Sequence, residues 1–269
     1  MRIALGVEYD GSAFHGWQQQ PRGNTVQDAL QAALSRIAGL PVAVVCAGRT
    51  DAGVHATAQV VHFDTRVERP LSAWVRGTNT YLPAAVAVRW AHPVADDFHA
   101  RFSAHARCYR YLLINRPQRT GVWHGRAGWY HHPLDVEVMQ QAAAMLLGEH
   151  DFSAFRAADC QAKSPVRTIR KADVQRSGEM IVFDFEAGAY LHHMVRNLVG
   201  SLVYVGQGKH PAEWIGRLLT LRDRRLAAPT FSAAGLYLVA VRYQSLWGLP
   251  VSKDSFLPGI CQVFDNREY

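Results

Sequence analysis

The feature that most constrains the fold of this 269-residue chain is an order of predicted strands and helices that occurs twice. Apolar residues alternate with polar or small ones at 3–9, which predicts a half-buried strand. A capping box at Thr25 and Asp28 and helical spacing up to Gly39 predict a helix. The remaining predicted elements of this half are strands at 42–46 and 59–63, a helix at 71–80 and a strand at 86–90. The first half therefore has the order β-α-β-β-α-β.

The second half repeats this order with one additional helix. Its predicted elements are a strand at 107–115, a helix from Asp135 to Gly148, strands at 166–175 and 180–186, a helix at 194–203 closed by Gly206 and Gly208, a short helix from Pro211 and a strand at 236–243. Such an order is typical of the ferredoxin-like fold, an antiparallel sheet with helices on one face. We therefore predict an α+β protein of two ferredoxin-like halves, 1–98 and 99–244, with their sheets side by side, a central cleft and an irregular tail at 245–269.

Positive charge is concentrated in one segment of the chain. The whole sequence has 29 Lys and Arg against 22 Asp and Glu, a formal charge of +7. Residues 98–134 contain six arginines, several aromatic residues and no acidic residue. Arginine interleaved with aromatic rings is typical of nucleic-acid binding, because guanidinium groups bind phosphates and rings stack on bases. A solvated basic face is the alternative at this level.

Several protein classes are excluded by simple patterns. No run approaches the ~18 apolar residues that a membrane span needs, and Glu8 interrupts the apolar N-terminal stretch, so we expect neither a membrane segment nor a signal peptide. The four cysteines are far apart, which argues against a disulfide framework and a zinc ribbon. We therefore expect a soluble protein of a reducing compartment.

Thirteen histidines raise the alternative of a metal-dependent hydrolase. The chain contains no H-x-x-x-H pattern, and its close pairs, His131-His132 and His192-His193, are adjacent in sequence. Neighbours on one element cannot easily converge on one ion. We therefore expect no metal site.

The loop at 48–56 contains a candidate reactive group. Asp51 lies between Gly48 and Gly53, and the neighbouring Arg49 would favour its ionised form, so Asp51 is a candidate nucleophile or base. The alternative is an Asx turn in which Asp51 only stabilises the loop. Local chemistry leaves both interpretations open.

The motif Arg49-Thr50-Asp51-Ala52-Gly53-Val54-His55 resembles the signature of the TruA-type tRNA pseudouridine synthases. Five further segments resemble that family in the same order along residues 2–243: Phe14-His15-Gly16-Trp17-Gln18, Phe98-His99-Ala100-Arg101-Phe102-Ser103, Arg107-Cys108-Tyr109-Arg110-Tyr111, Leu191-His192-His193-Met194-Val195-Arg196-Asn197 and Gly235-Leu236-Tyr237-Leu238. Several motifs in order are more specific than the Asp51 loop alone.

The resemblance implies an enzyme that converts the uridines at tRNA positions 38, 39 and 40 in the anticodon stem-loop into pseudouridine. The N1–C1′ bond breaks and the base is rejoined through C5, without a metal or an organic cofactor. The resemblance further implies a homodimer that acts in the cytoplasm, with one tRNA touching both subunits. A non-catalytic RNA-binding module is the alternative, and it would have no special need for Asp51 or Tyr109.

The resemblance also implies a role for individual residues. Asp51 would be the catalytic aspartate, acting at base C6, at C1′ or on the 2′ proton, and Arg49 would assist base flipping. Tyr109 would stack on the flipped uracil and is a candidate for proton transfer. Arg196 would pair with Asp51 and keep it anionic, and Leu236 would pack on the far side of the base. Predicted tRNA contacts are Phe98, His99, Ala100, Arg101, Phe102, Arg69 and Lys163.

Overall fold

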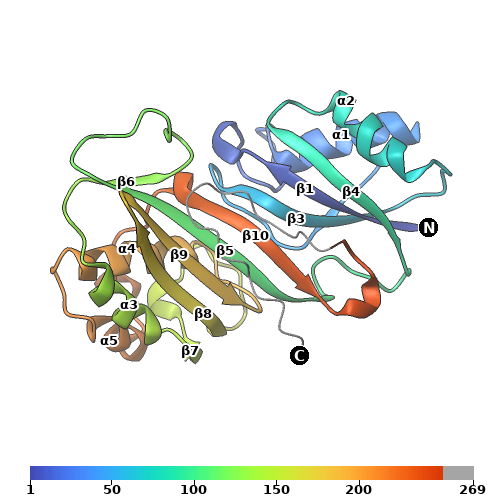
Figure 1. Cartoon of the computed structure of the whole chain (residues 1–269). Helices are drawn as coiled ribbons and strands as arrows, with labels where there is room; N and C mark the ends of the chain where they lie inside the picture. The colour runs from blue at the N-terminus through green and yellow to red at the C-terminus, as the bar shows by residue number, and fades with distance from the viewer. Residues whose placement is uncertain (251–269) are drawn as a thin grey trace.

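The computed structural model describes residues 1–250, whose strands form one mixed sheet of ten strands (Figure 1). The order across the sheet is β4-β1-β3-β10-β5-β9-β8-β7, with β2 paired to β3 and β6 paired to β5. The strands are β1 (Arg2–Tyr9), β2 (Val45–Cys46), β3 (His55–Asp64), β4 (Val86–Val94), β5 (Ala104–Asn115), β6 (Gly128–Tyr130), β7 (Gly148–Asp151), β8 (Val166–Ser177), β9 (Met180–Ala187) and β10 (Leu236–Tyr243). The α-helices are α1 (Val26–Ala38), α2 (Thr78–Tyr81), α3 (Val136–Ala144), α4 (Met194–Gly206) and α5 (Trp214–Leu221).

A short parallel contact joins the two parts of the sheet. The last strand, β10, pairs antiparallel with β5 along most of its length and parallel with β3 only at Tyr237–His55 and Leu238–Ala56. Strands from the first 98 residues therefore lie on one side of this joint, and strands from later residues lie on the other (Figure 1). The predicted α+β class with sheets side by side is confirmed. The division into 1–98 and 99–244 as domains stays a prediction.

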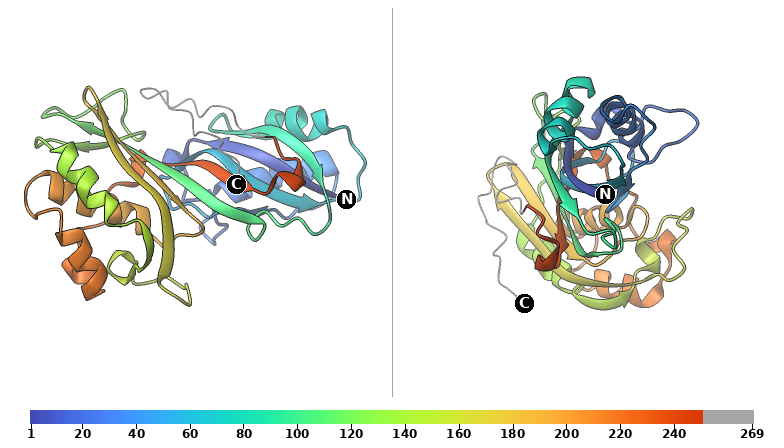
Figure 2. Two further views of the ribbon diagram at one scale, coloured as in Figure 1. Left: turned by 60° about the horizontal axis from the view of Figure 1, so that its bottom comes forward. Right: turned by 90° about the vertical axis from the view of Figure 1, so that its right-hand side faces the viewer.

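The helices pack on one face of the sheet and form one connected core. This core contains Leu30 of α1, Met139 of α3, Leu202 of α4 and Leu218 of α5, together with one face of the strands. The helices gather near the two ends of the long sheet (Figure 2). The side chains of β5 alternate between this core and a smaller cluster on the opposite face: Tyr109, Tyr111 and Leu113 face the helices, whereas Cys108, Leu112 and Ile114 face away.

The predicted helix signals are present at α1 and α3. Thr25 is the N-cap of α1, and its side chain accepts a hydrogen bond from the Asp28 backbone N–H. The helix ends at Gly39, whose φ of 70° is left-handed, a conformation that favours glycine. Asp135 caps α3 in the same way as Thr25 caps α1, by accepting bonds from two backbone N–H groups. None of the described helices combines the length and the hydrophobicity that a membrane span requires.

Several predicted boundaries were wrong. Strand β3 begins at His55, inside the predicted loop, because its first residues pair with the distant β10. Only Val45–Cys46 of the predicted strand at 42–46 is paired. The helix predicted at 71–80 contains a π-helical segment, Ala73–Gly77, before α2.

The second half also differs from its prediction at short elements. The helix α3 ends at Ala144, and Gly148, predicted to end it, begins β7 with a φ of 94°. The strands β6 and β7 were not predicted, because three or four residues are too few to show a period. Of the predicted tail, Ser245–Trp247 forms a 3₁₀ turn, and residues 251–269 lie outside the described residues.

Candidate active site

The loop that contains Asp51 lies at the joint between the two parts of the sheet. It connects β2 to β3 and is held by its backbone: Trp17 N donates to Thr50 O (3.0 Å), Val54 N donates to Asp51 O (3.1 Å) and Gln59 Nε2 donates to Gly48 O (2.6 Å). The Asp51 side chain itself is 22% exposed. A firmly held backbone therefore presents a carboxylate that solvent reaches.

Gly16 explains how the segment at 14–18 approaches this loop. Its φ is 84°, and a Cβ at this position would lie 2.8 Å from Thr50 O, so only glycine fits without displacing the loop. From the other side, the Thr50 and Tyr9 hydroxyl oxygens lie 2.8 Å apart in a buried hydrogen bond. These contacts fix the residue that precedes Asp51.

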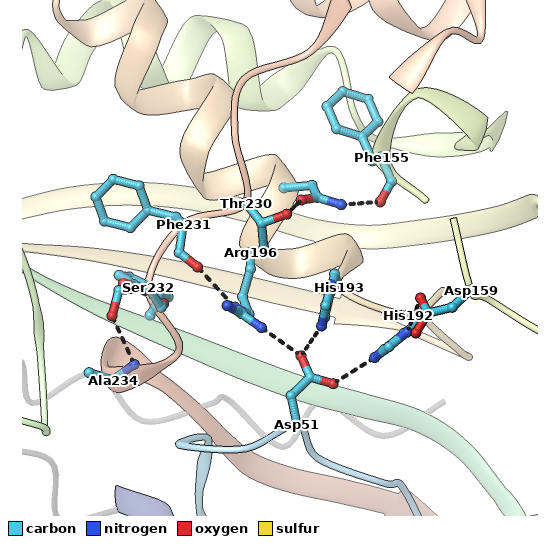
Figure 3. A network of polar contacts seen from close by, with 12 residues as sticks. Asp51, Phe155, Asp159, His192, His193, Arg196, Thr230, Phe231, Ser232 and Ala234 are labelled. Carbon is cyan, nitrogen blue, oxygen red and sulfur yellow. Dashed lines mark hydrogen bonds and ion pairs between the residues drawn. The ribbon is translucent and has the colours of Figure 1, made fainter. Parts of the chain in front are cut away.

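Three side chains from the start of α4 and the residues before it surround the Asp51 carboxylate (Figure 3). Arg196 Nη1 donates to Asp51 Oδ2 at 3.0 Å, and Arg196 Nε donates to the carbonyl of Phe231 at 2.9 Å. His193 Nε2 lies 3.4 Å from the same Oδ2 atom, and His192 Nε2 lies 3.4 Å from Oδ1. The site is therefore assembled from both parts of the chain, with Asp51 from the first half and its partners from the second.

His192 also connects the carboxylate to a second acid. Its Nδ1 lies 2.9 Å from Asp159 Oδ1, and the Asp159 side chain is 73% exposed. The hydrogen bond from His192 is the main cause that lowers the pKa of Asp159. The order Asp51–His192–Asp159 thus runs from the half-buried site to the surface.

Tyr109 lies on β5, on the face that points toward the helices, and it is buried. Burial raises the pKa of Tyr109, and the Asp51 charge raises it further, so the phenol is neutral at ordinary pH. Its ring packs edge-to-face against Tyr190, with centroids 5.1 Å apart. Among residues 1–250 its hydroxyl has no hydrogen-bond partner, although the group is not sealed from solvent.

Arg49 and Leu236 occupy contrasting environments. Arg49 is exposed, and within the described part of the chain it makes no hydrogen bond or ion pair. Leu236 is buried at the start of β10, where it pairs with Tyr111 of β5. The structure therefore leaves the guanidinium of Arg49 available to a ligand, whereas Leu236 belongs to the core.

The predicted tRNA-contacting segment divides into buried and exposed residues. Phe98 and Ala100 are fully buried and can only support the segment. Arg101 and Phe102 are exposed, and the guanidinium of Arg101 lies 5.5 Å from the centroid of the Phe102 ring. His99 stacks on the same ring, with centroids 4.3 Å apart. Two further predicted contacts, Arg69 and Lys163, are exposed in segments outside the strands and helices.

Sequence reasoning missed Arg107 as part of the site's framework. This buried arginine donates to four backbone carbonyls: Ala104 of its own strand, Ala47 before the Asp51 loop, Arg101 in the exposed segment, and Gly188 after β9. The signal was present, because Arg107 shares a strand face with Tyr109 and Tyr111, where a charge needs buried partners.

The expectation that adjacent histidines cannot converge was wrong for one pair. The ligand atoms of Asp51, His192 and His193 lie within 4.8 Å of one another, which is close enough for one metal ion. His193 adopts a left-handed backbone conformation, with a φ of 59°, and the two imidazole centroids are 4.0 Å apart. The same carboxylate also binds Arg196, whose positive charge opposes a cation at this position.

The comparisons with known proteins agree on one family. The family model described as tRNA pseudouridine synthase matches residues 6–103 and 142–244. The chain belongs to the tRNA pseudouridine synthase family. Asp51, Arg196 and Leu236 lie inside the matched ranges, whereas Tyr109 lies between them.

Relatives named tRNA pseudouridine synthase A match almost the full length. The protein from Dechloromonas aromatica is 65% identical over 97% of this chain and 99% of its own. The protein from Aromatoleum aromaticum is 62% identical over 93% of this chain and 95% of its own. The protein from Methylobacillus flagellatus is 58% identical over 97% of this chain and 100% of its own. This synthase family acts on tRNA, so the basic, aromatic segment at 98–134 belongs to a protein with an RNA substrate.

Proposed function

We propose that this chain converts uridine to pseudouridine at positions 38, 39 and 40 of the tRNA anticodon stem-loop, with Asp51 as the catalytic residue. The observation that carries the proposal is the Asp51 carboxylate, which is partly exposed at the joint of the two halves and held by Arg196 at 3.0 Å. Membership of the synthase family supplies the reaction.

The reaction is an isomerisation and needs no external reactant. The N1–C1′ bond of uridine breaks, a C5–C1′ bond forms, the proton leaves C5, and N1 gains a proton. Asp51 serves this reaction by attacking C6 of the base, by attacking C1′, or by removing the 2′ proton of the ribose. All three routes need the same arrangement, in which a carboxylate oxygen meets the extruded nucleotide.

Tyr109 would receive the extruded base. Its ring supplies a flat apolar surface beside the Asp51 loop, and its hydroxyl has no partner within residues 1–250. Since the raised pKa keeps the phenol protonated, Tyr109 offers a hydrogen-bond donor to the base and can move a proton only in concert with another group. Leu236 would pack against the other side of the base.

Base flipping follows from the position of the target within paired RNA. Extruding a base costs a few kcal/mol in lost stacking and pairing. Arg49 lies in the same loop as Asp51 and has no competing partner among the described residues, so it can occupy the space that the base leaves. Its positive charge also suits the surrounding phosphates.

The tRNA body would be held by exposed basic and aromatic groups. Arg101, Arg69 and Lys163 would bind phosphates, and Phe102 with His99 would offer a stacked aromatic surface. Phe98 and Ala100 would support this segment from the core. Because phosphate contacts release counterions, tRNA affinity should fall steeply with salt.

The remaining parts of the proposal are a homodimer, the cytoplasm as location, and activity without a metal. For a homodimer, we expect sedimentation at working concentration to give a mass twice that of one chain. Metal independence predicts unchanged activity after dialysis against EDTA. Loss of activity after EDTA, restored by Zn²⁺, would instead favour a metal at Asp51, His192 and His193.

The test of the proposal maps the product. Unmodified tRNA is incubated with the purified protein, treated with a carbodiimide that labels pseudouridine, and analysed by mass spectrometry of its fragments. We expect label at positions 38, 39 and 40 with the wild-type chain and none with Asp51→Ala. The matched control is Asp173→Ala, which removes an exposed β8 carboxylate paired with Lys171. Tight tRNA binding without any label would favour a non-catalytic RNA-binding module.

A further inference from the structure

His193 adopts a backbone conformation that its own helix does not require. Its φ of 59° and ψ of 3° are left-handed, a state that costs a non-glycine residue about 1 kcal/mol or more. It is the N-cap of α4, yet its side chain makes no capping hydrogen bond. Serine, threonine or aspartate would cap this helix better. The imidazole therefore stabilises something other than the helix terminus.

The side chain of His193 points at the catalytic carboxylate instead (Figure 3). Its Nε2 lies 3.4 Å from Asp51 Oδ2, the oxygen that also accepts from Arg196 at 3.0 Å. His193 directly precedes α4 and Arg196 lies in its first turn, and the following residues of the helix are buried in the core. One rigid element thus contacts a single carboxylate oxygen twice.

The other oxygen is held less firmly. Asp51 Oδ1 has one described contact, to His192 at 3.4 Å. His192 is 37% exposed, and its second nitrogen binds Asp159, which is more exposed still. An incoming nucleotide can displace such a surface side chain far more easily than it can move α4. Freeing Oδ1 thus requires only the displacement of His192, whereas Oδ2 is also bound by Arg196.

We propose that His193 is a positioning residue for the reaction: together with Arg196 it fixes Oδ2 of Asp51 and thereby directs Oδ1 at the flipped nucleotide. This inference rests on the proposed function, in which Asp51 is the catalytic residue. It assigns the two oxygens of one carboxylate different tasks, one structural and one chemical.

The charge state of His193 fits this task. Burial lowers the pKa of His193. The nearby His192 and Arg196 lower this pKa further, whereas the charges of Asp51 and Asp159 raise it. A neutral imidazole packs its Nε2 edge against Oδ2, at 3.4 Å, without adding a second full positive charge. The carboxylate is then oriented by His193, while Arg196 supplies the only full positive charge among these two partners.

The experiment removes the imidazole with a substitution that suits the left-handed backbone, so that a loss of activity does not result from misfolding. His193→Gly removes the imidazole and keeps a residue that favours a φ of 59°. The control is Arg222→Gly, at an exposed residue with a φ of 58° at the end of α5. The assay is pseudouridine formation on full-length tRNA with the full-length chain, with kcat and KM determined separately and with imidazole added to one series.

We expect kcat of His193→Gly to fall about 10- to 100-fold, because a misplaced reactive group loses rate without losing substrate. KM should change less than about 2-fold, and added imidazole should restore part of kcat. Arg222→Gly should retain wild-type kcat. His193→Asn, which tolerates the same backbone but is too short to reach Oδ2, should behave like His193→Gly and serves if the glycine variant folds poorly.

An unchanged kcat in both His193 variants overturns the inference, as does a defect confined to KM or one that imidazole does not relieve. Asp51→Ala is measured beside them. If Asp51→Ala keeps wild-type activity, the proposed function itself fails. If Asp51→Ala is inactive while His193→Gly is fully active, only the role of His193 fails.

Discussion

Two arginine–aspartate pairs in this molecule differ in how many carboxylate oxygens accept a hydrogen bond from the arginine. Arg110 and Asp184 are direct cross-strand partners on β5 and β9 and form two hydrogen bonds, of 2.8 and 2.9 Å, one to each oxygen. Arg196 donates to only one oxygen of Asp51. The exposed fractions are similar, at 14% for Asp184 and 22% for Asp51. Geometry rather than burial therefore distinguishes the structural pair from the pair in the site.

The same contrast holds for the tyrosines and arginines around the site. Tyr111 donates its hydroxyl to Ser232 O at 2.9 Å, whereas Tyr109, on the same strand face, has no partner within the described residues. Arg107 is saturated by backbone carbonyls, whereas Arg49 makes no described polar contact. At the site, Tyr109 and Arg49 therefore keep bonding capacity for a substrate, whereas Tyr111 and Arg107 use theirs within the fold.

The largest expected effect distinguishes Asp51 from Asp184. Asp51→Asn should lower kcat at least about 10³-fold with nearly unchanged stability, because it removes the reacting carboxylate. Asp184→Asn should lower the free energy of unfolding by about 2 to 4 kcal/mol, because Arg110 loses its bidentate partner, and should leave kcat within about 3-fold. Urea unfolding measures the free energy of unfolding, and single-turnover kinetics measure the rate of the reaction. Equal rate losses in the two variants would contradict the distinction.

The next effect concerns the two tyrosines. Tyr109→Phe keeps the ring and removes the hydroxyl, so kcat should fall about 10²-fold if that group takes part in proton transfer, with little change in KM. Tyr111→Phe should cost about 1 kcal/mol of stability and no activity, because it removes only the bond to Ser232. Wild-type kcat in Tyr109→Phe would limit Tyr109 to stacking.

The arginine comparison predicts a smaller, substrate-dependent effect. Arg49→Ala should slow the modification of a uridine in a paired stem about 10-fold, because a group that fills the vacated space is lost. A substrate with a mismatch opposite the target uridine should lose less, since its base costs less to extrude. Arg107→Lys should instead destabilise the fold and give the same relative rate on both substrates. A mismatch-independent defect in Arg49→Ala would argue against a role in flipping.

A further effect, on stability rather than rate, concerns the buried histidine His62 of β3. His62 is buried, and its Nδ1 accepts from Ala100 N at 3.1 Å, beneath the tRNA-contacting segment. Burial lowers the pKa of His62 to about 4, with Arg2 and His99 adding to the shift. The unfolded chain therefore binds the proton first, so this contribution is complete above the unfolded pKa of 6.5 and is lost as pH falls from 6.5 to 4.

The loss from His62 amounts to about 3 kcal/mol at most over that range. His62→Asn keeps an acceptor for Ala100 but does not titrate. The difference in free energy of unfolding between wild type and this variant should therefore narrow as pH falls from 7 to 4. A difference that does not vary with pH would contradict the assignment of a neutral His62.

Local sequence predicted the elements of the fold better than their junctions. The period of α1 and its Thr25 cap lie within one stretch of chain, so that helix was predicted to the residue. The extension of β3 to His55 depends on β10, which lies more than 170 residues later in the chain, and no local pattern contains that information. The pairing of β3 with β10, which joins the two halves, could therefore be seen only in the structure.

The site shows the same division. Asp51, Tyr109 and Arg196 were predicted through their motifs, and the structure places Arg196 on Asp51. The contact of His193 with Asp51 was not predicted, because it depends on a left-handed φ that histidine seldom adopts. The burial of Phe98 and Ala100, in a segment predicted to touch tRNA, likewise depends on packing against distant residues such as Tyr243.

The most direct test of the central claim follows the hydrogen that pseudouridine formation must release. Unmodified tRNA that carries tritium at uridine C5 is mixed with excess protein, and tritium appearing in water is counted over time. We predict release with the wild-type chain and background release with Asp51→Ala, although both proteins bind the tRNA. Equal release by the two proteins would contradict the assignment of Asp51 as the residue that performs the chemistry.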